Sequence, residues 1–239
     1  MIKQFKTPIT QKIVEIGPGI KKDQIILATE TSCDETACAI VLNGVNHLNA
    51  HVCANYIDSD LEPPFLCLLV SGGHTQLIKV DSYSEQKILG ETLDDAVGET
   101  YDKVARLLGI PYPGGPNLDK LAKQGDKNKF KLPIAKVGEF DFSFSGLKTA
   151  MLRLIKELEQ QYIDKHPDSK ILIPVHDIAA SFQETVSETL MKKVLKTAEK
   201  FGINTIVIAG GVAANSEIRR KMFELENNGF KVYAPLIKY

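Results

Sequence analysis

Two apolar stretches separated by a small polar turn constrain this chain more than any other feature. Residues 65–70 (FLCLLV) form a continuous apolar run, and residues 76–80 (QLIKV) alternate polar and apolar side chains. The pair predicts a β-hairpin around the turn at residues 71–75 (SGGHT). Because the two glycines carry no Cβ atoms, the turn amides can approach an anion such as a phosphate. A plain hairpin turn is the alternative that this stretch alone leaves open.

Composition sets the broad class. The 239 residues are 44% hydrophobic with a formal net charge of −1, which suits a globular chain of one large domain or two small lobes. Contact with nucleic acid would need local basic patches, for which residues 192–200 and 219–221 are candidates, although such runs are usually the solvated face of a helix. The absence of a membrane-length apolar run, of an apolar signal core and of CxxC spacing predicts a cytoplasmic protein with reduced thiols and no membrane contact.

A second hairpin is predicted near the N-terminus, after an irregular arm at residues 1–22. Residues 24–29 and 37–42 read as strands, and the polar turn between them holds the carboxylates of Glu30, Asp34 and Glu35. Three such groups at one strand end suit a cation, a set of hydrogen-bond donors or an activated nucleophile. A solvated acidic turn remains the alternative.

Two histidines follow at helical spacing. His47 and His51 would share one face of a helix, a spacing that suits one divalent metal. Leu48 stands where a zinc peptidase has its glutamate base, so protease chemistry is not indicated. A pair of histidines without a third ligand is also compatible with surface or packing roles.

Three further segments carry glycine turns or acidic side chains. Residues 93–108 predict a helix with an acidic face that includes Asp102, and the rigid turn at residues 111–116 contains Gly115 and precedes Asp119. Residues 203–209 predict a buried strand that leads through two glycines into a helix from about residue 216. Such a strand, glycine pair and helix N-terminus favour nucleotide binding, while Asn215 serves either as the helix cap or as a ligand contact.

Two other helices are expected to form the core. One follows Ser145, which we expect to cap it, and buries apolar residues through residue 158; a polar insertion follows at residues 160–170. The other is capped by Asp177 and ends at Gly202. A short strand at residues 141–144 precedes the first helix, and a final strand spans residues 230–234.

Seven motifs follow one another along the chain: residues 30–36 (ETSCDET), 46–51 (NHLNAH), 69–75 (LVSGGHT), 92–103 (TLDD through YDK), 112–116 (YPGGP), 142–148 (FSFSGLK) and 210–215 (GGVAAN). In this order they resemble the motifs of the TsaD family, the tRNA adenosine threonylcarbamoyltransferases. The resemblance implies an α/β fold of the actin, Hsp70 and sugar-kinase type, with two lobes around a nucleotide-like cleft. It also implies transfer of a threonylcarbamoyl group from threonylcarbamoyl-AMP to N6 of adenosine 37 in tRNAs that read codons beginning with A, with release of AMP.

The resemblance assigns roles to individual residues. His47 and His51 match the family's metal ligands, for one Fe²⁺ or Zn²⁺, and Asp34 matches an acidic, catalytic position near the reacting carbonyl. Further positions match substrate contacts: Leu69, Val70, Ser71, Gly72, Gly73, Asp102, Gly115, Asp119 and Asn215. The family's partners, a paralogous subunit and an ATPase, are expected with it.

The sequence also departs from the family pattern. A long block of the first lobe is absent between residues 41 and 43, and the chain stops before the segment whose aspartate is the third metal ligand. We therefore expect an incomplete first lobe at residues 23–60, a second lobe at residues 61–239, weak or no metal binding, and low or no activity. A catalytically inactive nucleotide- or partner-binding relative and a sugar-kinase-like phosphotransferase are the alternatives.

Overall fold

The computed structural model describes residues 25–32, 35–42, 51–56, 59–166 and 172–235. For residues 25–42 it describes the backbone alone. The predicted arm at residues 1–22, Asp34 and His47 lie outside the described residues.

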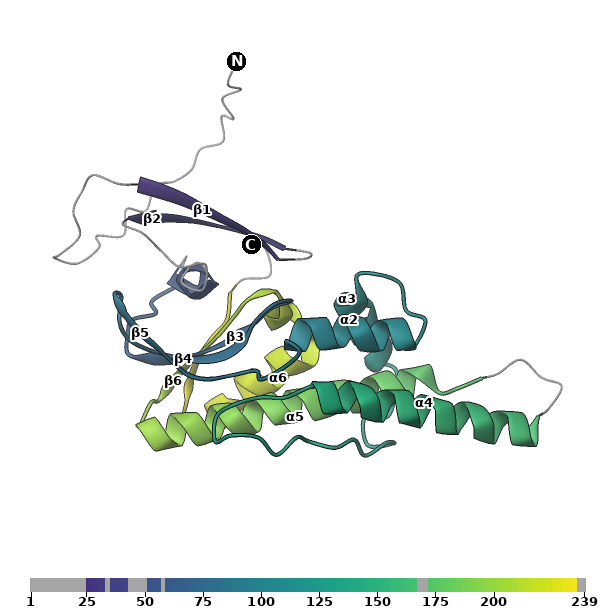
Figure 1. Ribbon diagram of the computed structural model, residues 1–239. Helices are drawn as coiled ribbons and strands as arrows, with labels where there is room; N and C mark the ends of the chain where they lie inside the picture. The colour runs from purple at the N-terminus through teal and green to yellow at the C-terminus, as the bar shows by residue number, and fades with distance from the viewer. Residues whose placement is uncertain (1–24, 33–34, 43–50, 57–58, 167–171, 236–239) are drawn as a thin grey trace, which may run out of the picture.

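A five-stranded mixed sheet forms the centre of the molecule (Figure 1). The predicted hairpin is confirmed and lies in the middle of this sheet. Its first strand, at residues 65–70, pairs antiparallel with its second strand and parallel with the strand at residues 205–209. The edge strand at residues 85–91, which follows the hairpin, was not predicted. In sheet order the strands are β5 (Glu85–Glu91), β4 (Thr75–Ser82), β3 (Phe65–Val70), β6 (Thr205–Ala209) and β7 (Lys231–Tyr233).

The N-terminal hairpin makes a separate two-stranded antiparallel sheet. Strands β1 (Ile25–Ser32) and β2 (Glu35–Leu42) are longer than predicted and pair as far as Ser32 with Glu35. The expected turn with three carboxylates is therefore wrong in its extent, because Glu30 and Glu35 belong to the strands. Only residues 33–34 separate the two strands.

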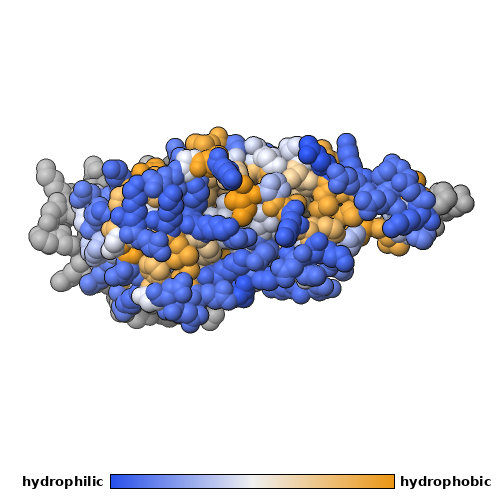
Figure 2. Space-filling view, turned by 90° about the horizontal axis from the view of Figure 1, so that it is seen from below, coloured by the Kyte–Doolittle hydropathy of each residue, from blue (hydrophilic) through white to orange (hydrophobic). Residues whose placement is uncertain are grey.

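Helices cover the sheet and extend beyond it (Figure 1). The long helices lie on its lower side, and Figure 2 shows that this lower surface is largely hydrophilic with an apolar strip between charged rows. The α-helices are α2 (Val97–Leu107), α3 (Gly114–Ala122), α4 (Ser145–Lys165), α5 (Val175–Phe201) and α6 (Ser216–Glu224). The short 3₁₀ segments are η1 (Ala54–Tyr56), η2 (Gly211–Ala214) and η3 (Leu225–Asn228).

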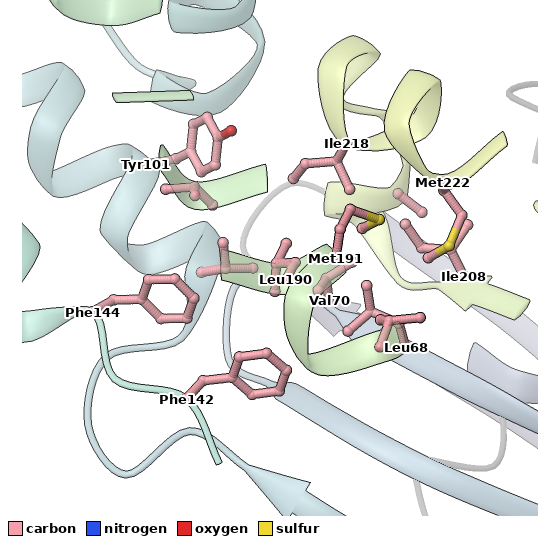
Figure 3. Close-up of a cluster of buried hydrophobic side chains, with 14 of the residues drawn as sticks. Leu68, Val70, Tyr101, Phe142, Phe144, Leu190, Met191, Ile208, Ile218 and Met222 are labelled. Atoms are coloured by element: carbon pink, nitrogen blue, oxygen red, sulfur yellow. The ribbon is translucent and has the colours of Figure 1, made fainter. Parts of the chain in front are cut away.

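Strand β3 is buried on both faces, which explains its unbroken apolar sequence. Leu66, Leu68 and Val70 face the larger core, which α5 and α6 complete, and Figure 3 shows Leu68 and Val70 beside side chains of those helices. The alternate residues of β3 belong to a smaller core that includes Val52. Because side chains of a strand point alternately to opposite faces, one short run anchors both layers.

Helix α2 starts later than predicted. The periodic pattern suggested a start at residue 93, but the helix begins at Val97, whose amide donates to the Thr75 hydroxyl over 2.8 Å. Leu93 is 62% exposed and does not join the helical stripe. The hydroxyl at the start of β4 therefore fixes where the helix begins.

The carboxylate of Asp94 takes the capping role that was predicted for Ser145. Its Oδ1 accepts from the amides of Phe144 (2.7 Å) and Ser145 (3.3 Å), and its Oδ2 accepts from the Ser143 and Ser145 hydroxyls. Ser145 is instead the first residue of α4. The short strand expected at residues 141–144 is reduced to a single bridge between Phe142 and Thr92.

The long helix α5 holds a segment that has no helix or strand of its own, residues 126–139. Asp177, predicted as the cap of α5, lies inside the helix and accepts from the amide of Asp126 over 2.8 Å. At the other end, Lys193 Nζ donates to the carbonyls of Gly138 (2.5 Å) and Glu139 (3.2 Å). The segment therefore lies along α5 and is held mainly by side chains of that helix. Gly202 ends α5 with a φ of 63°, as predicted.

Candidate functional site

A cavity of about 280 Å³ opens where β3 and β6 end. Because these two strands run parallel, their carboxyl ends meet at the same edge of the sheet, where ligands bind in many α/β proteins. Its walls come from the turn after β3, from α2 and α3, and from the segment that follows β6. The lining residues are Gly72, Gly98, Tyr101, Asp102, Gly115, Pro116, Asp119, Lys120, Lys123, Gly211, Val212, Ala214 and Asn215.

Five of the residues expected to contact substrate line this one cavity. They are Gly72, Asp102, Gly115, Asp119 and Asn215, and they come from four segments that are far apart in the sequence. The glycine turns after β3 and after β6 open onto the same space, as the prediction of a ligand site requires.

The turn after β3 is stabilised by its own serine. The Ser71 hydroxyl accepts from the amides of Gly73 (3.3 Å) and His74 (3.0 Å), so these two amides are directed at the protein. The Thr75 hydroxyl likewise accepts from a protein amide, at the start of α2. Gly72 lines the cavity, and its amide has no hydrogen bond among the described residues.

Leu69 and Val70, the two predicted contacts within β3, do not line the cavity. Leu69 and Val70 have fully buried side chains, which pack in the smaller and the larger core respectively. Gly210, in the turn that follows β6, has a φ of +85°, and a Cβ there would lie 2.4 Å from the Val70 carbonyl oxygen. The end of β3 thus sets the close approach between the two glycine turns.

Gly98 brings α2 directly against the turn after β3. Its amide donates to the Ser71 carbonyl over 3.2 Å, and a Cβ at this position would lie 2.7 Å from that same oxygen. Sequence reasoning did not single out Gly98, although a glycine in the first turn of a predicted helix is a signal for close packing.

Asp102 fixes the start of α3. Its Oδ1 accepts from the amide of Gly114 over 3.0 Å, which ties the first residue of α3 to α2. The rigid turn predicted at residues 111–116 is correct only at its beginning, because Gly114 already opens a helix. Asp102 and Gly115 therefore line the cavity from two joined helices.

Asp119 and Asn215 face each other through a buried glutamine. Asp119 Oδ1 accepts from Gln183 Nε2 (2.9 Å) and from the Ser216 hydroxyl (2.7 Å), while Asn215 Nδ2 donates to Gln183 Oε1 (3.0 Å). Asn215 Oδ1 also accepts from two amides in the first turn of α6, so the capping role that was left open is present. Gln183 and Ser216 were missed from the sequence.

Tyr101 adds a buried hydroxyl to the cavity wall. The residue is 1% exposed, and burial together with the carboxylates of Asp119 and Glu217 raises the pKa of Tyr101 well above its ordinary value. Asn215 lies near enough to oppose this shift weakly, but the hydroxyl makes no hydrogen bond of standard geometry to the described residues. It therefore stays protonated, and its oxygen is shielded from solvent in the structure.

Two lysines stand at the rim of the cavity. Lys120 and Lys123 line it, and Lys123 Nζ lies 3.4 Å from Asp119 Oδ2. Both are exposed, so they leave a positive charge beside a space otherwise lined with glycines, apolar side chains and carboxylates.

The two basic runs noted in the sequence are ion-paired surfaces of helices. On α5, Lys192 lies 2.7 Å from Glu188 and Lys200 lies 2.5 Å from Glu139; on α6, Lys221 lies 2.7 Å from Glu184. These pairs favour the solvated-face interpretation.

The predicted metal pair is only half described. His51 is buried at 5% exposure in the helical residues 51–53, whereas its predicted partner His47 lies outside the described residues. The part of the chain that the structure describes contains no group of three His, Cys, Asp or Glu side chains arranged to hold a metal ion. These residues alone do not form a metal site, and the metal stays a prediction. Nor does any described helix have the length and apolar content to cross a bilayer.

Comparison with known structures defines the class of protein as an α/β fold of the expected two-lobe type with an incomplete first lobe. A crystal structure of full-length HypF in a phosphate- and nucleotide-bound form superposes with a TM-score of 0.59 at 16% identity, over 80% of this chain and 39% of HypF. At that identity the likeness establishes the fold alone.

Comparison of sequences establishes the family. The TsaD model, described as tRNA N6-adenosine threonylcarbamoyltransferase, matches residues 35–239, and the chain belongs to this family. Proteins of that name from Synechocystis sp. and Thermosipho africanus are 49% and 48% identical to it, over 95% and 83% of this chain. The matched regions span 65% and 58% of those relatives, so the chain corresponds to somewhat more than half of their length.

Proposed function

We propose that the cavity binds the adenylate part of threonylcarbamoyl-AMP and that the chain takes part in threonylcarbamoyl transfer to tRNA. The observation that carries this proposal is the convergence of Gly72, Asp102, Gly115, Asp119 and Asn215 on one cavity. At about 280 Å³ the cavity is near the lower end of the usual range for small-ligand pockets, roughly 300–1,000 Å³, and suits a mononucleotide.

The proposed reaction is an acyl transfer that needs no covalent enzyme intermediate. The exocyclic N6 amine of adenosine 37, in tRNAs that read codons beginning with A, attacks the carbamoyl carbon of threonylcarbamoyl-AMP. The new C–N bond forms as the bond from that carbon to the phosphate oxygen breaks, AMP leaves with the electron pair, and N6 loses a proton. The protein must therefore hold the phosphate and tolerate the negative charge that AMP retains.

The described residues suit that task. The Gly72 amide and the rim cations Lys120 and Lys123 offer positive potential to a phosphate, and Asp119 offers an acceptor for hydroxyl groups of a ribose. The protonated Tyr101 hydroxyl supplies one further donor from the wall. These contacts would hold the leaving group in place while the amine approaches from the open side.

The metal and the acidic residue near the reacting carbonyl remain part of the proposal and carry no step of it. His47 and His51 are the proposed ligands of one Fe²⁺ or Zn²⁺, and Asp34 is the proposed catalytic carboxylate. A paralogous subunit, an ATPase and a cytoplasmic location are proposed on the family relationship alone.

Two measurements test this function. First, isothermal titration with AMP should show one site per chain, and Asp119→Asn should weaken it, whereas Asp164→Asn on the exposed end of α4 should not. Second, the chain is mixed with tRNA, labelled threonine, bicarbonate, ATP and the adenylate-forming enzyme, and label on the tRNA is counted.

The outcomes separate the alternatives. Label above the level of a blank without the chain supports the transferase, and AMP binding without transfer identifies an inactive nucleotide-binding relative. ATP hydrolysis stimulated by a polyol, with no transfer, would identify a sugar-kinase-like phosphotransferase. No AMP binding by the unaltered chain refutes the proposed site.

A further inference from the structure

The buried glutamine of α5 links Asp119 on one wall of the cavity to Asn215 on another, and the Ser216 hydroxyl adds a second link between these walls at Asp119. Gln183 is 4% exposed and Asp119 is 9% exposed, so both side chains have left bulk water. Each polar atom of the Gln183 amide group has a partner: Nε2 donates to Asp119 Oδ1 over 2.9 Å, and Oε1 accepts from Asn215 Nδ2 over 3.0 Å.

The donors and acceptors in this row of hydrogen bonds allow only one orientation of the Gln183 amide group. Because Asn215 Oδ1 accepts from the two amides of the first turn of α6, its Nδ2 must face Gln183. Gln183 must then offer Oε1 to Asn215, which leaves Nε2 for the carboxylate of Asp119. Rotating the Gln183 amide by 180° would place oxygen against oxygen at Asp119 and nitrogen against nitrogen at Asn215.

The same series of hydrogen bonds, from Asn215 through Gln183 to Asp119, determines which atoms remain free for a ligand. Asp119 Oδ1 already accepts from Gln183 and from the Ser216 hydroxyl, so Oδ2, with only Lys123 at 3.4 Å, is the oxygen open to the cavity. Asn215 Nδ2 has one hydrogen besides the one given to Gln183, since Oδ1 is taken by the helix, and the Tyr101 hydroxyl lies near this amide at the cavity wall.

We propose that Gln183 is a positioning residue of the site: it orients the Asp119 carboxylate and the Asn215 amide so that one acceptor and one donor face the adenylate. The proposal rests on the proposed function for the identity of the ligand. Gln183 itself does not line the cavity, so it acts through its two partners.

Substitutions at position 183 separate positioning from general stability. Gln183→Leu keeps a similar volume and removes both hydrogen bonds, and AMP affinity should fall at least tenfold, because the two ligand-facing groups lose their fixed orientation. Gln160→Leu, a glutamine on the exposed part of α4, is the matched control and should stay within twofold of the unaltered chain.

A double-mutant cycle tests whether Gln183 acts through Asp119. Asp119→Asn and Gln183→Leu are measured singly and together by AMP titration. If Gln183 works through Asp119, the double variant should lose no more affinity than the weaker-binding single variant. Additive losses, or an affinity of Gln183→Leu within twofold of the unaltered chain, overturn the proposal.

A second variant covers the case in which Gln183→Leu does not fold. In Gln183→Glu the introduced carboxyl group can replace the amide only when protonated, since it must donate to Asp119, the carboxylate that faces it from α3; Lys123 lies beyond Asp119. AMP binding should be weak at pH 7.5 and recover toward that of the unaltered chain, measured at the same pH, as the pH falls to about 5. Equal relative affinity at both pH values contradicts the proposal.

If AMP does not bind at all, the proposed function is refuted. A measurement without ligand then still tests whether Gln183 positions Asn215. Hydrogen exchange of the Glu217 and Ile218 amides reports on the Asn215 cap. With Gln183→Glu at pH 7.5, exchange at these two amides should rise at least fivefold while the middle of α4 stays unchanged. Unchanged exchange at the two amides shows that Gln183 does not position Asn215.

Discussion

Replacing Gly98 by alanine tests the contact on which the shape of the cavity depends. The added Cβ would lie 2.7 Å from the Ser71 carbonyl oxygen, 2.9 Å from Gly72 Cα and 3.0 Å from Gly72 N. All three atoms belong to the backbone, so no side-chain rotation relieves the clash. Ordinary van der Waals contact begins at 3.4 Å, and α2 must therefore separate from the turn by about 0.7 Å.

Two effects on stability oppose each other in Gly98→Ala. Overpacking against backbone costs about 1–3 kcal/mol, while alanine is about 1 kcal/mol better than glycine in a helix interior. The net loss of unfolding free energy should therefore be no more than about 2 kcal/mol. Binding should suffer more, because the Gly72 amide moves with the turn, and a lost hydrogen bond to a charged phosphate of about 1.5 kcal/mol corresponds to roughly a tenfold weaker affinity.

Thermal denaturation and AMP titration of the same preparations check this prediction. Gly146→Ala is the control, because a Cβ there has nothing within 4 Å and the residue lies in α4, away from the cavity; its affinity should not change. An unaltered AMP affinity and unaltered stability in Gly98→Ala would show that the contact between α2 and the turn does not shape the site.

Three other substitutions have defined expectations. Asp94→Ala removes the acceptor for the start of α4; because Asp94 is exposed, we expect a loss of about 1–2 kcal/mol in unfolding free energy at pH 7, measured by urea denaturation. Burial acts to raise the pKa of Asp94, but hydrogen bonds from Ser143, Phe144 and Ser145 outweigh it and lower the pKa below 3.8. The difference in unfolding free energy between the variant and the unaltered chain should therefore be full above pH 3.8 and vanish as the pH falls through the lowered pKa. Tyr101→Phe removes a buried hydroxyl that lacks a standard hydrogen bond, so the melting temperature should stay equal or rise while AMP affinity falls about three- to tenfold; a fall in melting temperature with unchanged affinity would assign the hydroxyl to the fold. Gly210→Ala combines a φ of +85° with a Cβ 2.4 Å from the Val70 oxygen and should cost at least about 3 kcal/mol, seen as loss of the folded circular dichroism signal on mild heating; a stable Gly210→Ala protein would contradict the close approach of the two turns.

The sequence predicted elements best where one physical signal dominates. The apolar run of β3 could be recognised because both of its faces are buried, and the end of α5 because Gly202 adopts a left-handed conformation. Helix α3 was missed because its first three residues are Gly-Gly-Pro, which usually indicate a turn. The cap of α4 was misassigned because Asp94 reaches it from about 50 residues away, which no local pattern encodes.

The candidate site was predictable to the extent that its residues carry motif chemistry. The glycine turn pointed to Gly72, the acidic helix face to Asp102 and the family resemblance to Asp119, and the structure brings the three together. Gln183 was not predictable, because it matters through partners that only the folded chain supplies; a glycine within a predicted helix signalled close packing at Gly98 but not the turn that it packs against. An amphipathic helix position gives no sign that its polar side chain joins two other helices.

The way α5 carries residues 126–139 has a consequence for handling the protein. Several of these attachments are ionic, such as Lys200 with Glu139 and Lys127 with Glu184, and exposed ion pairs weaken as the Debye length shrinks from about 10 Å at 0.1 M salt to about 3 Å at 1 M. Concentrated sodium chloride should therefore loosen residues 126–139 where these ion pairs hold them, while the sheet and helices persist. Trypsin would then nick the chain near Lys129 and Lys131 long before global unfolding.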